Sequence, residues 1–225
     1  VPARILNTYE ERGLSFSQGY GMTETSPGAT SLPPAMTRAK QGSVGLPHFF
    51  TDVRIADANG ATAPPGSVGE IEIAGPNVFA GYHGLPEATS AAFTGDGWFR
   101  SGDLGRLDAD GYLYISGRLK DMIISGGENI YPAEVEKALA EHPAVADAGV
   151  FGVPDTKWGE VGYAVVSLRP GRRADAEDLR EFLLGRIAKY KIPASFRFVD
   201  ELPRNAVGKV LKNRLRDAYA KEETP

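Results

Sequence analysis

Residues 97–136 read GWFRSGDLGRLDADGYLYISGRLKDMIISGGENIYPAEVE. The first half contains two strand-like runs, WFRSGDLGRL and YLYISGR, which are joined by Asp110-Gly111, a strong short-range hairpin signal. In the second half, Pro132 can occupy the first turn of an amphipathic helix. The stretch therefore predicts a change from β structure to mixed structure, and we place the domain boundary at Gly117 to Lys120.

The segments on either side extend this pattern. Between residues 51 and 74, two alternating runs, DVRIAD and VGEIEIA, flank a turn-prone stretch, which predicts a β-meander. Beyond the boundary, Asp175 can cap a helix over DAEDLREFLLGRI, and strand-like runs precede and follow that helix. The sequence thus predicts a mixed α/β protein, with a β-rich domain over residues 1–118 and a small α+β domain over residues 119–225.

The segment from residue 19 to residue 47 is rich in Gly, Pro, Ser and Thr and lacks periodicity, so we expect loops there. Its first residues could hold a polar ligand. Tyr20 could stack on a ring, and Gly21 would let a ligand approach the backbone closely. Thr23 can donate a hydrogen bond to a ligand oxygen, and Glu24 could hold a hard cation such as Mg²⁺. The alternative is a glycine-punctuated turn with solvated polar residues.

Further signals are weak when each is taken alone. Asp103, at the end of a strand-like run, could accept hydrogen bonds from a sugar diol, and Arg118 could bind a phosphate or a ribose. Gly126-Gly127 permits either a tight turn or a narrow channel past bare backbone. Lys209 follows a Pro/Gly-rich turn near the end of the chain. The alternatives are ordinary turns, a charged solvated linker and a solvated lysine.

Composition narrows the classes of function. The 225-residue chain has a formal net charge of −4 and a pI near 5.5, which argue against a nucleic-acid partner. The chain has no cysteine, which fits a reducing cytoplasm, and no stretch approaches the roughly twenty apolar residues of a membrane span. His48, His83 and His142 lack the spacing of metal ligands, so we predict no zinc site.

Collinear motifs cover nearly the whole chain: GYGMTETSP, GEIEIAGPNVFAGY, the stretch 97–136 and PRNAVGKVLK. In residue identity and spacing they resemble the later core motifs of the adenylate-forming, AMP-binding superfamily. This superfamily includes acyl-CoA synthetases, peptide-synthetase adenylation domains and luciferase. LKDMIISGGENIYPAEVE and PDTKWGE look most like bacterial fatty-acyl or related acid–CoA ligases. The resemblance implies that a carboxylic acid and ATP give an acyl-adenylate and pyrophosphate, after which the thiol of coenzyme A displaces AMP.

The resemblance also implies roles in the β-rich domain, which would be the distorted, barrel-like end of a large adenylation domain. Tyr20 would stack on adenine, Thr23 would contact the phosphate, and Glu24 would help to bind Mg²⁺. Asp103 would hold the ribose hydroxyls, and Arg118 would contact the ribose and a neighbouring phosphate. These residues would together form the ATP site.

In the small mobile domain, the resemblance places Lys120 at the hinge about which the domain swings between adenylation and thioester formation. Gly126 and Gly127 would lie in the loop that lines the pantetheine tunnel for coenzyme A. Lys209 would be the mobile lysine that bridges the carboxylate of the acid and the α-phosphate. This domain would therefore serve both half-reactions.

The chain begins with Val1 rather than Met, and it lacks the Ser/Thr/Gly-rich phosphate loop ending in Pro-Lys-Gly that precedes these motifs in the superfamily. We therefore expect a C-terminal fragment that is inactive alone, and that could form a homodimer or be held by a companion N-terminal portion. Two alternatives stay open. One is an acyl-AMP ligase that loads a carrier protein, and the other is a non-catalytic nucleotide-binding or interaction module.

Overall fold

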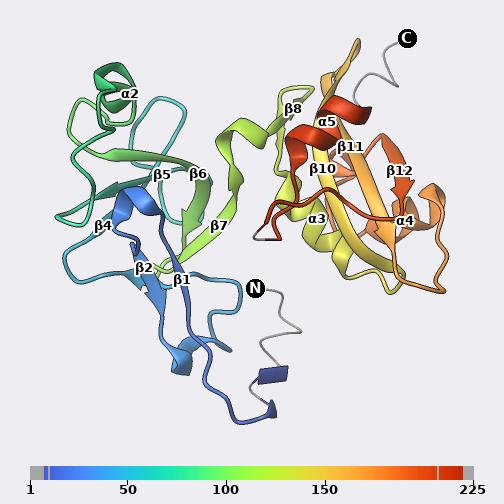
Figure 1. The fold of residues 1–225 in the computed structure, drawn as a ribbon, viewed down its shortest axis with the longest axis horizontal. Coiled ribbons are helices and arrows are strands. Elements are labelled where there is room, and N and C mark those ends of the chain that lie inside the picture. Colours follow the sequence, from blue (N-terminus) through green and yellow to red (C-terminus); the bar gives the residue numbers. More distant parts are fainter. Residues whose placement is uncertain (1–7, 10, 207, 220–225) are drawn as a thin grey trace. The chain divides into compact units, whose positions relative to one another are not determined.

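The computed structural model describes residues 8–9, 11–206 and 208–219. The chain divides into two compact units, residues 1–119 and residues 120–225, and each has its own sheets (Figure 1). The mixed α/β class that the sequence predicts is confirmed.

The first unit contains two antiparallel sheets. The three-stranded sheet has the order β1 (Gln18–Tyr20), β2 (Thr30–Leu32), β3 (Leu46–Pro47). The four-stranded sheet has the order β4 (Asp52–Ala56), β5 (Gly69–Ala74), β6 (Phe99–Leu107), β7 (Leu113–Arg118). The strands β4 and β7 are the two ends of the second sheet, so the described residues form open sheets and not the closed barrel that a barrel-like domain would suggest.

The hairpin between β6 and β7 forms as predicted. Leu107 pairs with Leu113, and Gly111 takes a positive φ of 82°, a conformation that glycine adopts without steric cost. The carboxylate of Asp108 accepts hydrogen bonds from the amides of Asp110 and Tyr112, at 3.0 and 2.9 Å. The Asp108 side chain therefore satisfies two backbone donors of the turn.

The two sheets of the first unit share one core. The carbonyl of Leu113 accepts from the amide of Val44 and from the hydroxyl of Ser43, both at 2.8 Å, so β7 is tied to the segment before β3. The buried side chains are Ala29, Ile55, Ile71, Ile73, Phe99 and Leu113. The expectation of loops over residues 19–47 was incomplete, because β1, β2 and β3 have only two or three residues each and show no readable alternation.

The second unit is a five-stranded sheet with helices on both faces. The path β10–β11–β8–β9 is antiparallel, and β12 pairs with β11 in parallel. The strands are β8 (Ile123–Ser125), β9 (Glu128–Ile130), β10 (Val145–Asp155), β11 (Gly159–Leu168) and β12 (Ser195–Val199). The helices that the structure describes from end to end are α2 (Pro86–Ala91), α3 (Pro132–Ala140), α4 (Ala176–Leu183) and α5 (Lys212–Tyr219). The 3-10 turns among the described residues are η1 (Thr23–Thr25), η2 (Pro34–Met36), η3 (Leu119–Asp121) and η4 (Lys189–Lys191).

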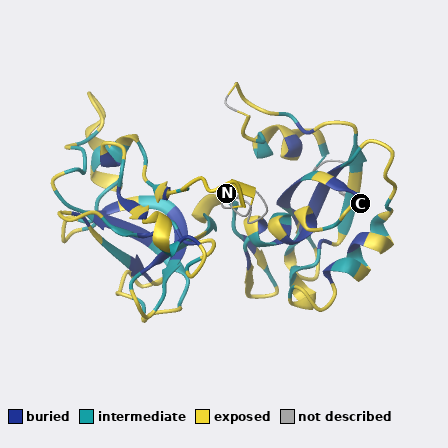
Figure 2. Cartoon of the chain, turned by 90° about the horizontal axis from the view of Figure 1, so that it is seen from below, coloured by how far each residue is buried: buried dark blue, intermediate teal, exposed yellow. Residues whose placement is uncertain are grey.

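Alternation along β11 assigns the two faces of this sheet. Ala164 and Val166 point into the cluster that contains the apolar sides of α3 and α4, whereas Tyr163 and Val165 point into the cluster that contains Leu215 of α5. Figure 2 shows the buried residues concentrated along the central strands. The sheet is therefore enclosed on both sides.

The helix at Asp175 starts where the sequence predicts and ends earlier. The Asp175 carboxylate accepts from the amides of Glu177 and Asp178, which caps α4. The helix stops at Leu183, because Leu184 takes an extended ψ of 129°. Within the described part of the chain, none of the helices has the length and apolar character that crossing a membrane requires.

We predict that residues 120–225 fold alone and that Leu179 anchors this fold. Leu179→Ala should lower the free energy of unfolding by about 2–5 kcal/mol, because Leu179 is fully buried and its removal leaves a cavity. Leu184→Ala, whose side chain is 51% exposed, is the matched control and should change it by less than about 0.5 kcal/mol. Urea unfolding of this unit measures both values, and equal effects would contradict the assigned core.

Candidate functional site

The candidate site centres on the carboxylate of Asp103 in β6. This residue is only 8% exposed, yet both of its side-chain oxygens are bonded. The hydroxyl of Tyr20 donates to Oδ2 at 2.8 Å, and Nε of Arg118 lies 3.2 Å from Oδ1. The structure thus brings together three residues that the sequence nominated from separate motifs, at the ends of β1 and β7 and in the middle of β6.

A bulge in β6 sets the direction of Asp103. Leu104 pairs with Glu70 and Arg100 pairs with Glu72, so residues 101–103 of β6 stand opposite a single residue of β5. The hydroxyl of Ser101 donates to the carbonyl of Ile71 at 2.6 Å and accepts from the amide of Asp103 at 3.1 Å. Bulges commonly re-aim a side chain next to a functional site.

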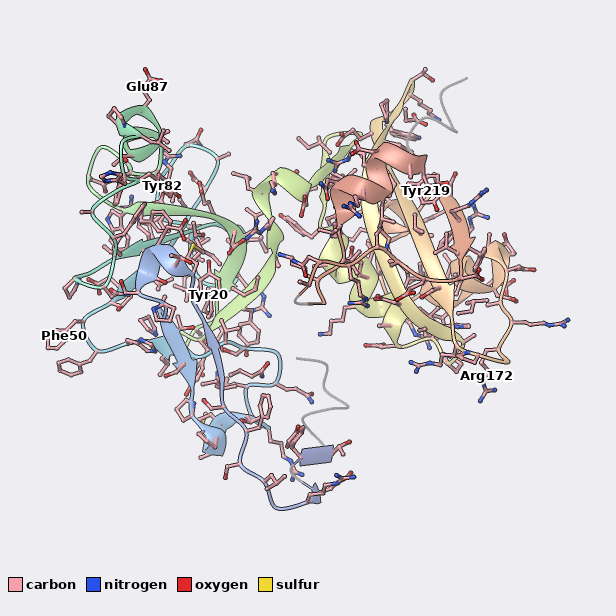
Figure 3. All side chains as sticks on the ribbon, viewed as in Figure 1. Tyr20, Phe50, Tyr82, Glu87, Arg172 and Tyr219 are labelled. Atoms are coloured by element: carbon pink, nitrogen blue, oxygen red, sulfur yellow. The ribbon has the colours of Figure 1, made fainter. Side chains whose placement is uncertain are left out.

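The Tyr20 phenol is held in its neutral form. Burial raises the pKa of Tyr20 well above its ordinary value, a hydrogen bond with Ser101 opposes this rise, and the charge of Asp103 adds to it. Tyr20 therefore serves as a hydrogen-bond donor to Asp103 over the whole physiological pH range. In Figure 3 Tyr20 lies among the side chains of the first unit, whereas Phe50, 73% exposed, projects from its edge.

The loop after Tyr20 is fixed by two features. A Cβ on Gly21 would lie 1.9 Å from the carbonyl oxygen of Pro27, so the close backbone approach at this glycine is made by the chain itself. The amide nitrogen Nδ2 of Asn77 donates to the carbonyls of Thr25 and Gly28, at 3.2 and 2.9 Å. Sequence reasoning missed Asn77, although it lies in the motif GEIEIAGPNVFAGY, because an asparagine in such a stretch is typical of an ordinary turn.

Glu24 and Thr23 lie in η1, next to this loop. Glu24 is half-buried, and its carboxylate accepts a hydrogen bond from the hydroxyl of Tyr82 at 3.0 Å. The main-chain carbonyl of Glu24 accepts from the amide of Phe79 at 2.8 Å. The Thr23 side chain is exposed. Tyr82 is a second residue that sequence reasoning missed. Among the described residues, no group of three or more His, Cys, Asp or Glu side chains could enclose a metal ion.

The other nominated residues belong to the second unit or to its border. Lys120 lies in η3, where one unit ends and the other begins. Gly126 and Gly127 take φ values of 59° and 86° and form the tight turn between β8 and β9. A Cβ on Gly126 would lie 2.7 Å from the ring of Trp158, whereas a Cβ on Gly127 would meet no atom within 4 Å. Lys209 is exposed in the turn before α5.

Two family models match this chain. The model of the AMP-binding enzyme matches residues 1–83, and the model of the AMP-binding enzyme C-terminal domain matches residues 134–209. The chain belongs to the AMP-binding enzyme family. The two matches fall on the two compact units, and the site around Asp103 lies in the first.

Curated relatives of this AMP-binding chain are named as CoA ligases or synthases. A feruloyl-CoA synthase of Amycolatopsis sp is 53% identical over 219 residues, which are 97% of this chain and 44% of the relative. An indoleacetate–CoA ligase of Aromatoleum aromaticum is 47% identical over 222 residues, 99% of this chain and 43% of the relative. The chain therefore spans less than half the length of these relatives.

Solved structures that match this chain include a CoA synthetase of the same kind as these relatives. The o-succinylbenzoate CoA synthetase of Bacillus subtilis, in complex with the acyl-adenylate intermediate OSB-AMP, has a TM-score of 0.89 at 46% identity. The match covers 96% of this chain and 44% of that one. The same enzyme has been solved in complex with ATP and magnesium ion, with a TM-score of 0.88.

Gly21→Ala should disrupt this loop of the AMP-binding enzyme. The new methyl group would clash with the carbonyl oxygen of Pro27. Because a side chain added to a tightly packed site forces its neighbours to shift, we expect the free energy of unfolding to fall by at least about 2 kcal/mol. Gly95→Ala is the matched control, because a Cβ there meets no atom within 4 Å and its φ is not positive. Chemical denaturation of both variants measures the difference, and equal stability would contradict the packing of this loop.

Proposed function

We propose that this chain is the C-terminal part of an AMP-forming acid–CoA ligase. The reaction would join a carboxylic acid to ATP, giving an acyl-adenylate and pyrophosphate, and the thiol of coenzyme A would then displace AMP. The observation that carries the proposal is the buried Asp103 carboxylate between Tyr20 and Arg118, in a chain that is about half identical to named CoA ligases.

The cluster around Asp103 suits a nucleoside. An ionised carboxylate has about four lone-pair sites. On Asp103, Tyr20 occupies one lone-pair site of Oδ2 and Arg118 occupies one lone-pair site of Oδ1. One site on each oxygen therefore remains for the two hydroxyls of a ribose. The Arg118 side chain is 47% exposed, so its terminal nitrogens are free to reach a phosphate. Tyr20 is only partly buried and would present its ring to adenine.

Thr23 and Glu24 would act at the phosphates. Glu24 fits Mg²⁺, because Mg²⁺ is usually bound through one or two carboxylates together with substrate phosphates, and the bond from Tyr82 leaves acceptor sites on this carboxylate. The bound ion would neutralise charge on the phosphates. The exposed hydroxyl of Thr23 would donate to a phosphate oxygen.

Lys209 would act between two anions. The carboxylate of the acid must approach the α-phosphate, and an ammonium group between them offsets a repulsion that grows in a site without water. Lysine on a movable unit, with Lys120 as the hinge, would let Lys209 withdraw after adenylation. Gly126 and Gly127 would then offer coenzyme A a path past bare backbone.

The relatives favour an aromatic acid over the fatty acid that the sequence suggested. Feruloyl, indoleacetate and o-succinylbenzoate all carry an aromatic ring. The acceptor could also differ from coenzyme A, because an amide bond synthetase of Marinactinospora thermotolerans matches this chain with a TM-score of 0.88 at 36% identity. Transfer to a carrier protein remains the other alternative.

A portion of the enzyme outside these residues would supply the phosphate loop and most of the acyl pocket, since the matched relatives are more than twice as long as the part that aligns. The chain alone would then be inactive, and it would be active with that portion in the cytoplasm. Pyrophosphate release and thioester formation should be measured with aromatic and fatty acids, on this chain and on the enzyme extended to its natural start. Turnover by the short chain would contradict the proposal.

In the extended enzyme, Lys209→Ala should lower the rate of adenylation by about 100-fold or more, as loss of one group that stabilises transition-state charge does. Thioester formation from supplied acyl-adenylate should stay within about 2-fold, because the lysine is not used in that step. Lys189→Ala, another exposed lysine of the same unit, is the control and should leave both rates unchanged. Equal loss of both half-reactions would contradict the role of Lys209.

Gly127→Leu should lower the rate of thioester formation and spare adenylation, because its side chain would enter the path proposed for coenzyme A. Space is open around Gly127, so the cost to folding should be mainly that of a side chain at positive φ. Gly185→Leu, with a φ of 80° and equally open surroundings, controls for that cost. An unchanged thioester rate in the Gly127 variant would exclude the path.

A further inference from the structure

The turn that carries Lys209 is a closed hairpin. Arg204 and Val210 form an antiparallel bridge, and the amide of Leu211 donates to the carbonyl of Pro203 at 2.8 Å. The two flanks of the turn are therefore paired before α5 begins. A lysine on such a turn has a defined starting direction, even though its side chain is exposed.

The tip of the hairpin is held by Asn205. Its side-chain oxygen accepts from the amide of Lys209 at 2.9 Å, and its carbonyl accepts from the amide of Gly208 at 2.9 Å. Gly208 takes a φ of 82°, which glycine adopts without strain. These bonds fix the backbone before the Cα of Lys209, and the amide of Asn205 donates to the carbonyl of Lys209 at 2.9 Å, which fixes the backbone after it.

Arg204 connects this tip to the sheet of the small unit. One terminal nitrogen of its guanidinium donates to the carboxylate of Asp147, and the other donates to the carbonyl of Gly208. Asp147 belongs to β10, and its second oxygen accepts from the amide of Ala148 at 3.0 Å. The peptide immediately before Lys209 is thus tied through one side chain to β10, the strand at one end of the sheet.

Arginine suits this connection better than lysine. A planar guanidinium offers several N–H groups in a fixed fork, so it can hold a carboxylate and a carbonyl at once, whereas an ammonium is a single point charge. The ion pair is partly exposed, with 42% of the Arg204 side chain and 30% of the Asp147 side chain accessible. Ion pairs of this kind contribute little to folding stability, so this pair is better suited to orienting the turn than to stabilising the fold.

A second ion pair fixes the chain beyond the turn. Nζ of Lys212, the first residue of α5, lies 2.7 Å from Oε1 of Glu136 in α3. The same oxygen accepts from the amide of Val150 in β10 at 2.8 Å. The hairpin is therefore anchored on both sides to β10 and its neighbour α3.

We infer that Arg204, held by Asp147, is a positioning residue that aims Lys209 for adenylation. The inference rests on the proposed function, because it assigns a geometric task to the lysine of the first half-reaction. It predicts that loss of this connection impairs adenylation without impairing the folding of the unit or thioester formation.

The test uses the extended enzyme with the variants Arg204→Ala, Arg204→Lys and Asp147→Ala. Each should lower the rate of acid-dependent pyrophosphate release by about 10- to 100-fold, the effect of a displacement of about 1 Å at a reacting group. Thioester formation from supplied acyl-adenylate should stay within about 2-fold, and the thermal midpoint should change by less than about 3 °C. The double variant Arg204→Ala/Asp147→Ala should be no slower than the slower single variant, since the two residues act as one unit.

Arg216→Ala, which removes an exposed arginine of α5, is the matched control and should leave both half-reactions unchanged. Hydrogen exchange gives a readout that does not depend on turnover, because the amides of Gly208 and Lys209 should exchange faster in Arg204→Ala than in the wild type. If Arg204→Ala matches Arg216→Ala in rate and in exchange, or loses both half-reactions equally, the inference is wrong.

Failure of the proposed function would look different. The wild-type extended enzyme would then release no pyrophosphate with any acid of the panel, while the change in hydrogen exchange would still report whether Arg204 orders the hairpin. A normal wild-type enzyme with a full loss in Lys209→Ala and none in Arg204→Ala would keep the function and overturn only the positioning role.

Discussion

The ion pair between Asp103 and Arg118, completed by the hydroxyl of Tyr20, is the interaction on which the first unit's candidate chemistry depends. A carboxylate that is almost fully buried is costly unless it is paired and hydrogen-bonded, and removing one partner of such a pair typically costs about 3–5 kcal/mol. Here the two partners are the last residues of β1 and β7, so a charge that must be satisfied joins the ends of these two strands to the middle of β6. The bulge at residues 101–103 makes the arrangement possible by turning Asp103 out of the regular ladder.

The division of the chain into two units assigns two physical tasks. The first unit holds a preorganised acceptor with little freedom, because Asn77 and the close contact of Gly21 with Pro27 fix the loop beside Tyr20. The second unit presents Lys209 and the Gly126-Gly127 turn from one sheet that is packed on both faces. One compact unit that carries two different groups suits the proposed enzyme, which would deliver each of them at a different stage.

Much of this could be predicted from the sequence, for reasons that differ between elements. Long alternating runs and capped amphipathic segments gave β4 to β7, α3 and the start of α4, because their periodicity is local. The pairing of Tyr20 with Asp103 could not be predicted from spacing, since the two residues lie 83 positions apart and only the resemblance to a family placed them in one site. Asn77 and Tyr82 were missed because their roles depend on carbonyls and carboxylates of another segment. The barrel-like character that the resemblance implies for the first unit takes the form of open sheets in the described residues, because β4 and β7 are separate ends of the four-stranded sheet.

The most direct test of the central claim compares ATP with 2′,3′-dideoxy-ATP by calorimetry, in the extended enzyme and in its Asp103→Asn variant. If Asp103 holds the ribose hydroxyls, the wild type should bind the dideoxy nucleotide about 10- to 100-fold more weakly, as expected for hydrogen bonds to a charged group. The variant should bind both nucleotides with nearly equal affinity. The same ratio of affinities in both proteins would show that Asp103 does not contact the diol, and the account of this site would be wrong.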